Sequence, residues 1–219
     1  MKIKHILIDL DGTLTDPHVG ITRCIRYAMQ KMAMPLDEHI SLDWCIGPPL
    51  KASFLQLLQT ADEEKAEQAL AFYRERFSRV GLFENEVYPH VAVTLKTLRE
   101  QGYTLWVATA KPTIYATQIL QHFALADYFQ HIYGSELNGV RTDKGDLIAY
   151  ILERENLLAD QCIMVGDREF DILGARKNHI KTIAVNYGYG TKEEIAAAKP
   201  NYVVDSFAAL PTILEQLRA

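Results

Sequence analysis

The sequence predicts an α/β fold, a doubly wound parallel sheet, with an all-helical domain inserted after the first strand. Short apolar runs recur along the chain, and each is followed by a stretch whose apolar residues repeat with helical spacing. Such alternation of strands and helices is typical of a parallel sheet covered by helices on both faces. The insertion follows from residues 17–84, which contain helical patterns but no convincing strand.

The strand candidates are the short apolar runs outside the insertion. In chain order they span residues 5–10, 103–109, 131–134, 162–166, 182–186 and 202–204. The stretches between them carry apolar residues at helical spacing, and Thr191 with Glu194 forms a capping box that marks the start of another helix. Each strand is therefore expected to lead into a helix that packs back on the sheet.

The insertion contains two helical faces, in residues 21–32 and 66–77, and Gly81 ends the second helix. We interpret both faces as the core of a small bundle. The predicted domains are therefore a sheet domain made of residues 1–16 and 85–219, and a helical domain made of residues 17–84.

Composition excludes several classes of protein. The chain has 219 residues, of which 48% are hydrophobic and 23% charged, as in ordinary globular domains. The net charge of −5 and the lack of a basic stripe argue against a partner that is a nucleic-acid polymer. Three cysteines without a CxxC pair favour a reducing compartment, and no run approaches the roughly 20 apolar residues that span a bilayer. We expect a cytoplasmic protein that does not enter a membrane.

Polar residues gather where the predicted strands end. The first strand ends at Asp9 and Asp11, the second ends at residues 109–112, and the strand at 162–166 is followed by Asp167 and Asp171. Lys144 begins the helix that leads to this last strand. Ligands of open parallel sheets bind beyond the carboxyl ends of the strands, so these groups are expected to converge there. Carboxylates gathered in this way repel one another and predict a bound divalent cation, for which hard oxygen ligands favour Mg²⁺.

Each of these residues also has an ordinary structural interpretation. An Asp-x-Asp pair is common in turns and helix caps. Asp167 and Asp171 are consistent with a helix N-terminus that favours acidic residues, and Thr109 with a cap for the helix that begins near Pro112. Lys144, taken by itself, is consistent with a solvated surface lysine. The placement of all of them at strand ends, in this order, favours a site.

Four motifs resemble the signatures of the haloacid dehalogenase superfamily. They are DLDGTLTD at 9–16, VATAKP at 107–112, the lysine of TDKGDLIAYIL at 142–152, and VGDREFDI at 165–172. The helical insertion is similar to the cap of that family, which lies after the first strand of a Rossmann-like core. The resemblance implies a hydrolase. Because Asp11 is present, it implies phosphate chemistry, since the members that cleave carbon–halogen bonds lack this second aspartate.

The resemblance also implies roles for the residues. Asp9 is the nucleophile that forms an aspartyl-phosphate, and Asp11 is the general acid and then the general base. Mg²⁺ is held by Asp9, by Asp167 and by the backbone carbonyl of Asp11.

The remaining signature residues surround the phosphoryl group. Thr109 donates its hydroxyl, aided by backbone N–H groups at the helix start that include Ala110. Lys144 neutralises charge on the phosphoryl group and on the nucleophile. Asp171 stands one layer out and holds Lys144 or a metal-bound water.

Substrate choice is expected to depend on the insertion. The turn at 46–51, with Gly47 and Lys51, is the candidate specificity loop, although its prolines also suit a simple connector. Lys111, Arg23 and Arg26 are further cations that are candidates to face the cleft.

The stretches GITRCIRYA, IGPPLK, YPHV and NYGYG are similar to bacterial members labelled phosphoglycolate phosphatase or 5'-nucleotidase, with His90 where glycine is expected. We expect a small phosphorylated metabolite as substrate, a nucleoside monophosphate first and phosphoglycolate as the alternative, and a monomer or homodimer. An alternative of another class is a signalling protein phosphorylated on aspartate.

Overall fold

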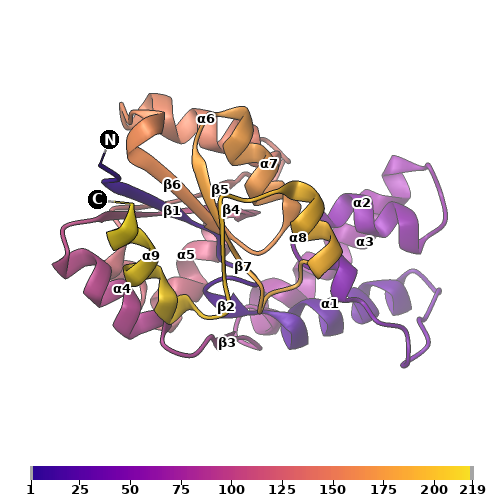
Figure 1. Cartoon of the computed structure of the whole chain (residues 1–219). Coiled ribbons are helices and arrows are strands. Elements are labelled where there is room, and N and C mark those ends of the chain that lie inside the picture. Colours follow the sequence, from indigo (N-terminus) through magenta and orange to yellow (C-terminus); the bar gives the residue numbers. More distant parts are fainter. Residues whose placement is uncertain (1, 218–219) are drawn as a thin grey trace. The chain divides into compact units, whose positions relative to one another are not determined.

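The computed structural model describes residues 2–217 (Figure 1). The chain divides into two compact units. The sheet unit comprises Met1–Asp16 and Val87–Ala219, and the helical unit comprises Pro17–Glu86. The predicted roles of these units, a catalytic core and a cap, stay predictions at this stage.

The sheet unit is built on six parallel strands in the order β5-β4-β1-β6-β7-β8. Their bounds are β1 His5–Ile8, β4 Thr104–Pro112, β5 His131–Ser135, β6 Cys162–Gly166, β7 Lys181–Val185 and β8 Tyr202–Val204. The first strand in the chain is central, because His5 of β1 pairs with Thr104 of β4 on one side and Cys162 of β6 on the other. The predicted doubly wound parallel sheet is therefore confirmed.

Helices cover both faces of this sheet (Figure 1). They are α4 Val91–Glu100, α5 Thr113–His122, α6 Lys144–Arg154, α7 Glu169–Lys177, α8 Lys192–Ala198 and α9 Leu210–Gln216, with short turns η3 Ala126–Tyr128, η4 Ala159–Gln161 and η5 Phe207–Ala209. On one face, α6 and α7 bury Ile148 and Ala175 against Leu7 of β1 and Met164 of β6. On the other face, α4 and α5 pack against β4.

Side-chain caps set where two of these helices begin. The carboxylate of Asp143 accepts the N–H of Asp146 at the start of α6, and the hydroxyl of Thr191 accepts the N–H of Glu194 at the start of α8. Both contacts satisfy N–H groups that have no partner inside a helix. The first cap makes Lys144 the first residue of α6, at the carboxyl edge of the sheet.

The helical unit contains α1 His18–Lys31, η1 Asp43–Cys45, α2 Leu50–Leu57, α3 Glu63–Arg76 and the π-helical turn η2 Phe77–Gly81. Helix α3 packs on both α1 and α2, and buries Tyr73 against Phe54. Gly20 lets α1 approach η2, because a Cβ at this position would lie 2.2 Å from the carbonyl oxygen of Gly81. Helix α2 was not predicted. It begins inside the segment interpreted as a turn, directly after Pro49, and proline is favourable before a helix.

Two short strands, β2 Thr15–Asp16 and β3 Glu86–Val87, pair where the chain leaves the sheet unit and returns to it.

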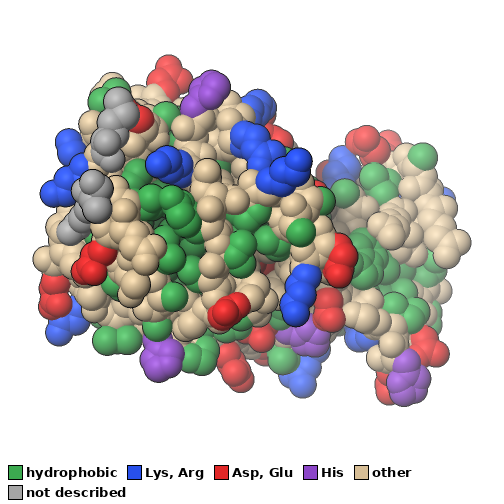
Figure 2. Space-filling view, viewed as in Figure 1, with side chains coloured by type: hydrophobic (Ala, Val, Ile, Leu, Met, Phe, Trp, Pro, Cys, Tyr) green, Lys and Arg blue, Asp and Glu red, His purple; other side chains and the backbone are tan. Residues whose placement is uncertain are grey.

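Acidic and basic side chains are interspersed on the face of the sheet unit in Figure 2, in line with the absence of a basic stripe in the sequence. All three cysteines are buried and none of them forms a disulfide. Within residues 2–217, no helix combines the length and the apolarity that crossing a membrane requires.

Candidate active site

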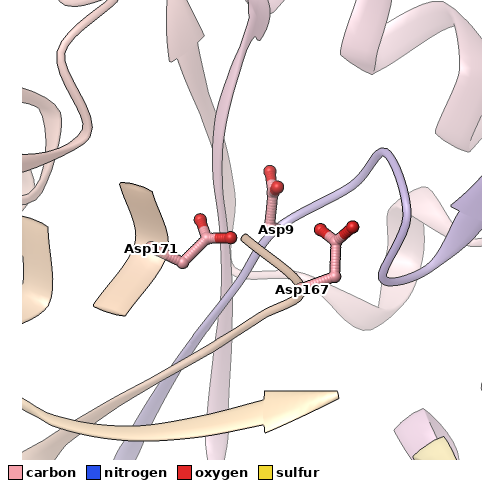
Figure 3. A group of neighbouring side chains, drawn as sticks. All are labelled: Asp9, Asp167 and Asp171. Carbon is pink, nitrogen blue, oxygen red and sulfur yellow. The ribbon is translucent and has the colours of Figure 1, made fainter. Parts of the chain in front are cut away.

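Three carboxylates meet at the carboxyl edge of the sheet (Figure 3). Asp9 follows β1 and is fixed there by its backbone N–H, which donates to the carbonyl of Val165 at 2.9 Å. Asp167 follows β6, and Asp171 lies in the first turn of α7. Each of the three offers an oxygen within 4.8 Å of the others, and all three side chains are buried. The structure thus brings together the aspartates that the sequence placed at separate strand ends.

Lys144 lies between two of these carboxylates. Its Nζ is 3.0 Å from Oδ1 of Asp9 and 2.7 Å from Oδ1 of Asp171, and it donates to the carbonyl of Ala108 at 2.9 Å. Burial alone would lower the pKa of Lys144, but Asp171 and Asp9 together raise it above its ordinary value. The ammonium therefore stays charged, and the interpretation of Lys144 as a solvated surface lysine is wrong.

Asp171 holds Lys144 and also begins a helix. Its Oδ2 accepts the backbone N–H of Arg168 at 3.1 Å, which caps α7, while Oδ1 faces Lys144. Burial raises the pKa of Asp171 to about 6, although Lys144 acts in the opposite direction. The contacts of Asp171 agree with both interpretations from the sequence, an acidic residue favoured at a helix N-terminus and the support for Lys144 that the family resemblance implies.

Asp11 has a lysine partner of its own. Nζ of Lys111 lies 2.8 Å from Oδ2 of Asp11, and both side chains are buried. Burial raises the pKa of Asp11, whereas the Lys111 ammonium acts to lower it. Oδ1 of Asp11 is buried without a hydrogen-bond partner among the described residues. The sequence placed Lys111 among the groups at the strand ends and suggested a role for it in specificity, but not a pairing with Asp11. Its pairing with Asp11 depends on the neighbouring positions of β1 and β4, which no local pattern reveals.

Thr109 lies inside a strand instead of at its end. Strand β4 continues to Pro112, with an irregularity in its pairing after Ala108, and α5 begins only at Thr113. Oγ1 of Thr109 accepts the backbone N–H of Lys111 at 3.2 Å, so Thr109 does not cap α5 and that alternative is wrong. Its hydroxyl proton remains available for donation.

Ser135 was not singled out in the sequence. This residue ends β5, and its buried hydroxyl donates to the carbonyl of Ala110 at 2.7 Å. The contact fixes the backbone between Thr109 and Lys111, where the sequence predicts phosphate binding.

The residues predicted to select the substrate from the insertion have partners within the helical unit. Lys51 lies in the first turn of α2, where its Nζ is 3.0 Å from Glu63 and 2.9 Å from Glu67. Arg23 pairs with Glu84 at 2.8 Å, and Arg26 donates to three backbone carbonyls, those of residues 37, 38 and 40. Gly47 has a φ of +104°, which favours glycine at this turn. A role for these residues in specificity stays a prediction.

The carboxyl edge has the chemistry of a site for a hard divalent cation. Its donors are buried carboxylate oxygens, the ligand type that Mg²⁺ prefers. Burial, and then the nearby charges of Asp171 and Asp9, raise the pKa of Asp167 well above its ordinary value. Such a shift measures how unfavourable another negative charge is here, and a bound cation would relieve it. The residues present therefore fit the predicted metal.

Comparison with known proteins defines the class of this chain. The family model of the haloacid dehalogenase-like hydrolases matches residues 6–185. That match contains all four signature motifs, from Asp9 to Ile172. The chain belongs to the haloacid dehalogenase-like hydrolase family.

Two curated relatives narrow the activity. The chain is 43% identical over 215 residues to the 5'-nucleotidase of Pseudomonas aeruginosa, covering 98% of this chain and 97% of that protein. It is 30% identical over 217 residues to the phosphoglycolate phosphatase of Vibrio vulnificus, covering 95% of each. The protein is accordingly an enzyme, a phosphoric monoester hydrolase.

Solved structures agree with this fold. The crystal structure of a predicted phosphatase from Clostridium acetobutylicum has a TM-score of 0.92 and 42% identity, covering 99% of each chain. The Mycobacterium tuberculosis protein tyrosine kinase A has a TM-score of 0.82 and 32% identity, covering 97% of this chain and 98% of that one. The same architecture thus carries both phosphatase and kinase names.

Proposed function

We propose that this protein is a Mg²⁺-dependent phosphatase that hydrolyses nucleoside 5'-monophosphates through an aspartyl-phosphate on Asp9. One observation carries the proposal. Two carboxylates only two residues apart, Asp9 and Asp11, have separate lysine partners, Lys144 at 3.0 Å and Lys111 at 2.8 Å. Different surroundings suit different tasks, and here they suit a nucleophile and a proton carrier.

In the first step, an oxygen of Asp9 attacks phosphorus, and the bond from phosphorus to the leaving oxygen breaks. Asp11 gives its proton to that leaving oxygen, so an alcohol departs and Asp11 becomes a carboxylate. The buried site favours this role because burial raises the pKa of Asp11 and makes the protonated form accessible. Lys144 stays charged beside Asp9 and offsets the negative charge that gathers there.

In the second step, Asp11 takes a proton from water while that water attacks the phosphoryl group on Asp9. The bond between phosphorus and Asp9 breaks, phosphate leaves, and both aspartates return to their starting forms. Thr109 donates its hydroxyl to the phosphoryl group, and Asp171 keeps Lys144 oriented. The protein contributes position and electrostatics, as phosphoryl transfer generally requires.

Asp9, Asp167 and the backbone carbonyl of Asp11 are the proposed ligands of Mg²⁺. When bound, the cation neutralises charge on the nucleophile and on the phosphoryl oxygens. The raised pKa of Asp167 and the crowding of buried carboxylates support this assignment.

Similarity across the whole chain supports the choice of substrate. The P. aeruginosa relative named 5'-nucleotidase is 43% identical over nearly all of the chain, including the insertion expected to contact the substrate. Phosphoglycolate is the second candidate because relatives named phosphoglycolate phosphatase match almost as much of the chain, at 30% identity. A third candidate, of another class, is a protein that keeps its phosphoaspartate and signals with it.

The test combines a general substrate with a defined set of metabolites. The wild type should hydrolyse p-nitrophenyl phosphate, and both chelation of divalent ions and the Asp9→Asn substitution should abolish turnover. Retained activity of Asp9→Asn would remove the nucleophile assignment. Among metabolites, nucleoside 5'-monophosphates should give a higher kcat/KM than phosphoglycolate or sugar phosphates. A higher value for phosphoglycolate would exchange the two candidates, and a stable phosphoaspartate without turnover would favour signalling.

We place this enzyme in the cytoplasm, acting on small phosphorylated metabolites as a monomer or homodimer. Its three buried cysteines, none in a disulfide, support a reducing location. Fractionation of the source cells tests the location, and light scattering of the purified protein tests the oligomeric state.

A further inference from the structure

The loop between β7 and α8 lies directly on Asp167. The backbone N–H of Tyr189 donates to Oδ2 of Asp167 at 2.8 Å. A Cβ added to Gly188 would lie 2.4 Å from Cβ of Asp167 and 2.4 Å from the carbonyl oxygen of Gly12. A Cβ added to Gly190 would lie 2.0 Å from the carbonyl oxygen of Asp167. The loop therefore has no room for side chains on the side that faces Asp167.

Gly188 and Gly190 allow the loop backbone to approach Asp167 closely, and they are not needed for an unusual backbone conformation. Neither Gly188 nor Gly190 has a positive φ, so other residues could adopt their backbone conformation. A Cβ on Gly12 would lie 2.2 Å from Oδ2 of Asp167. Gly12 and Gly188 therefore both lie against the side chain of Asp167, at distances that leave no room for a methyl group on either glycine.

Tyrosines on the same loop fasten it to the segment that follows Asp11. The hydroxyl of Tyr187 donates to the carbonyl of Thr13 at 2.7 Å, and its ring packs edge-on against Tyr88 with 4.8 Å between centroids. The hydroxyl of Tyr189 bonds to the carboxylate of Asp16. These contacts tie the loop to the segment that carries Asp9 and Asp11.

We propose that residues 187–190 form a positioning loop, which holds the Asp167 carboxylate in the orientation that binds the cation. The Tyr189 N–H occupies Oδ2, whereas Oδ1 has only a longer contact, 3.4 Å from Oγ1 of Thr13. One oxygen is held by the protein, which would leave the other to bind the cation, as second-layer hydrogen bonds do at many metal sites. This inference rests on the proposed Mg²⁺ site.

The first test is Mg²⁺ binding to the metal-stripped protein, measured by titration calorimetry. Gly188→Ala pushes the loop away from Asp167 and is expected to weaken Mg²⁺ binding at least about tenfold. Gly102→Ala is the matched control. Its φ is +86°, so alanine strains the backbone there, but no atom lies within 4 Å of the added Cβ. It should lower the melting temperature and leave Mg²⁺ affinity within about twofold of wild type, since it touches no group of the site.

A second measurement uses the wild type and does not depend on the folding of a variant. In a two-dimensional amide NMR titration, the Tyr189 N–H signal should shift with Mg²⁺ and saturate with the same affinity as the heat signal. An unmoved Tyr189 signal, or an unchanged affinity in a folded Gly188→Ala protein, overturns the positioning role while the proposed function stands. A wild type that binds no Mg²⁺ overturns both.

Discussion

Lys144 is the charge on which the stability of the metal-free site depends most directly. Its ammonium contacts two buried carboxylates, Asp9 at 3.0 Å and Asp171 at 2.7 Å. At an effective dielectric constant of about 20, each contact supplies roughly 5–6 kcal/mol of attraction. The desolvation of the buried ammonium offsets several kcal/mol of this gain. Replacement by methionine keeps much of the volume and leaves the carboxylates uncompensated.

We expect Lys144→Met to lower the free energy of unfolding by about 3–5 kcal/mol at pH 7.5, the usual cost of breaking a buried ion pair from one side. Lys177 provides a matched control because it also contacts two carboxylates, Asp146 at 2.8 Å and Asp143 at 3.8 Å, but its side chain is 63% exposed. Lys177→Met should therefore cost no more than about 1 kcal/mol.

Urea unfolding in the presence of a chelator measures both variants. Buried Trp106 in β4 gives a fluorescence signal from the sheet unit, and circular dichroism follows the helices. The loss in Lys144→Met should shrink at pH 5, because the stranded carboxylates can then bind protons in the folded state. In the double variant Lys144→Met/Asp171→Asn, the loss of unfolding free energy should be at least about 1 kcal/mol smaller than the sum of the losses in the two single variants. Strict additivity, or a loss equal to that of Lys177→Met, would refute the reasoning.

Three further predictions concern single side chains. Lys111→Met should shift to higher pH the limb of the pH–rate profile that reports Asp11, because the Lys111 ammonium lowers the pKa of Asp11. Lys111→Arg keeps the positive charge and should leave that limb in place. Asp171 has a folded-state pKa raised to about 6 from 3.8, so its contribution favours folding at low pH and is lost as pH rises through that range. Replacement by asparagine should therefore flatten the fall in apo-protein stability between pH 4 and 6, which calorimetric melting at each pH would show. His90 has a φ of +66°, and His90→Gly should raise stability by up to about 1 kcal/mol in thermal melts by relieving this strain; a lower melting temperature would contradict that reason.

The bounds of a strand could be predicted well where a buried apolar run ends directly at a polar or charged residue. The predicted strand at 162–166 matches β6 in full because its five residues are all buried and an acidic residue follows. Helix α2 escaped prediction because its eight residues follow two prolines and are too few for a clear periodic face. Thr109 was placed at a strand end because the apolar run stops there, yet pairing with β5 extends β4 to Pro112.

The site shows the same division between local and distant information. Asp9, Asp167 and Lys144 lie beside recognisable strand or helix ends, so a rule about strand edges brings them together. The partners of these groups cannot be found by such a rule. The contact of Lys111 with Asp11, and that of the Tyr189 amide with Asp167, join segments that are far apart in the sequence. The second contact is made by a backbone N–H, which no side-chain pattern marks. The role of the glycines around Asp167 is visible only in the structure, which places them close to that side chain.

The central place of β1 has a consequence for the newly made chain. This strand is synthesised before the helical unit, whereas its neighbours β4 and β6 come after the whole of that unit. The helical unit is one continuous run and has all its packing partners once Glu86 is made. The apolar run Ile6, Leu7 and Ile8 must wait unpaired for much longer, as non-local pairing generally requires.

Charged residues flanking an exposed apolar strand oppose its aggregation. Lys2 and Lys4 precede this run, and Asp9 and Asp11 follow it. In the unfinished chain, these two aspartates have neither their lysines nor a metal, and their charge is fully exposed to water. The carboxylates proposed for catalysis thus also stand where charge opposes aggregation of this strand before the rest of the sheet is made.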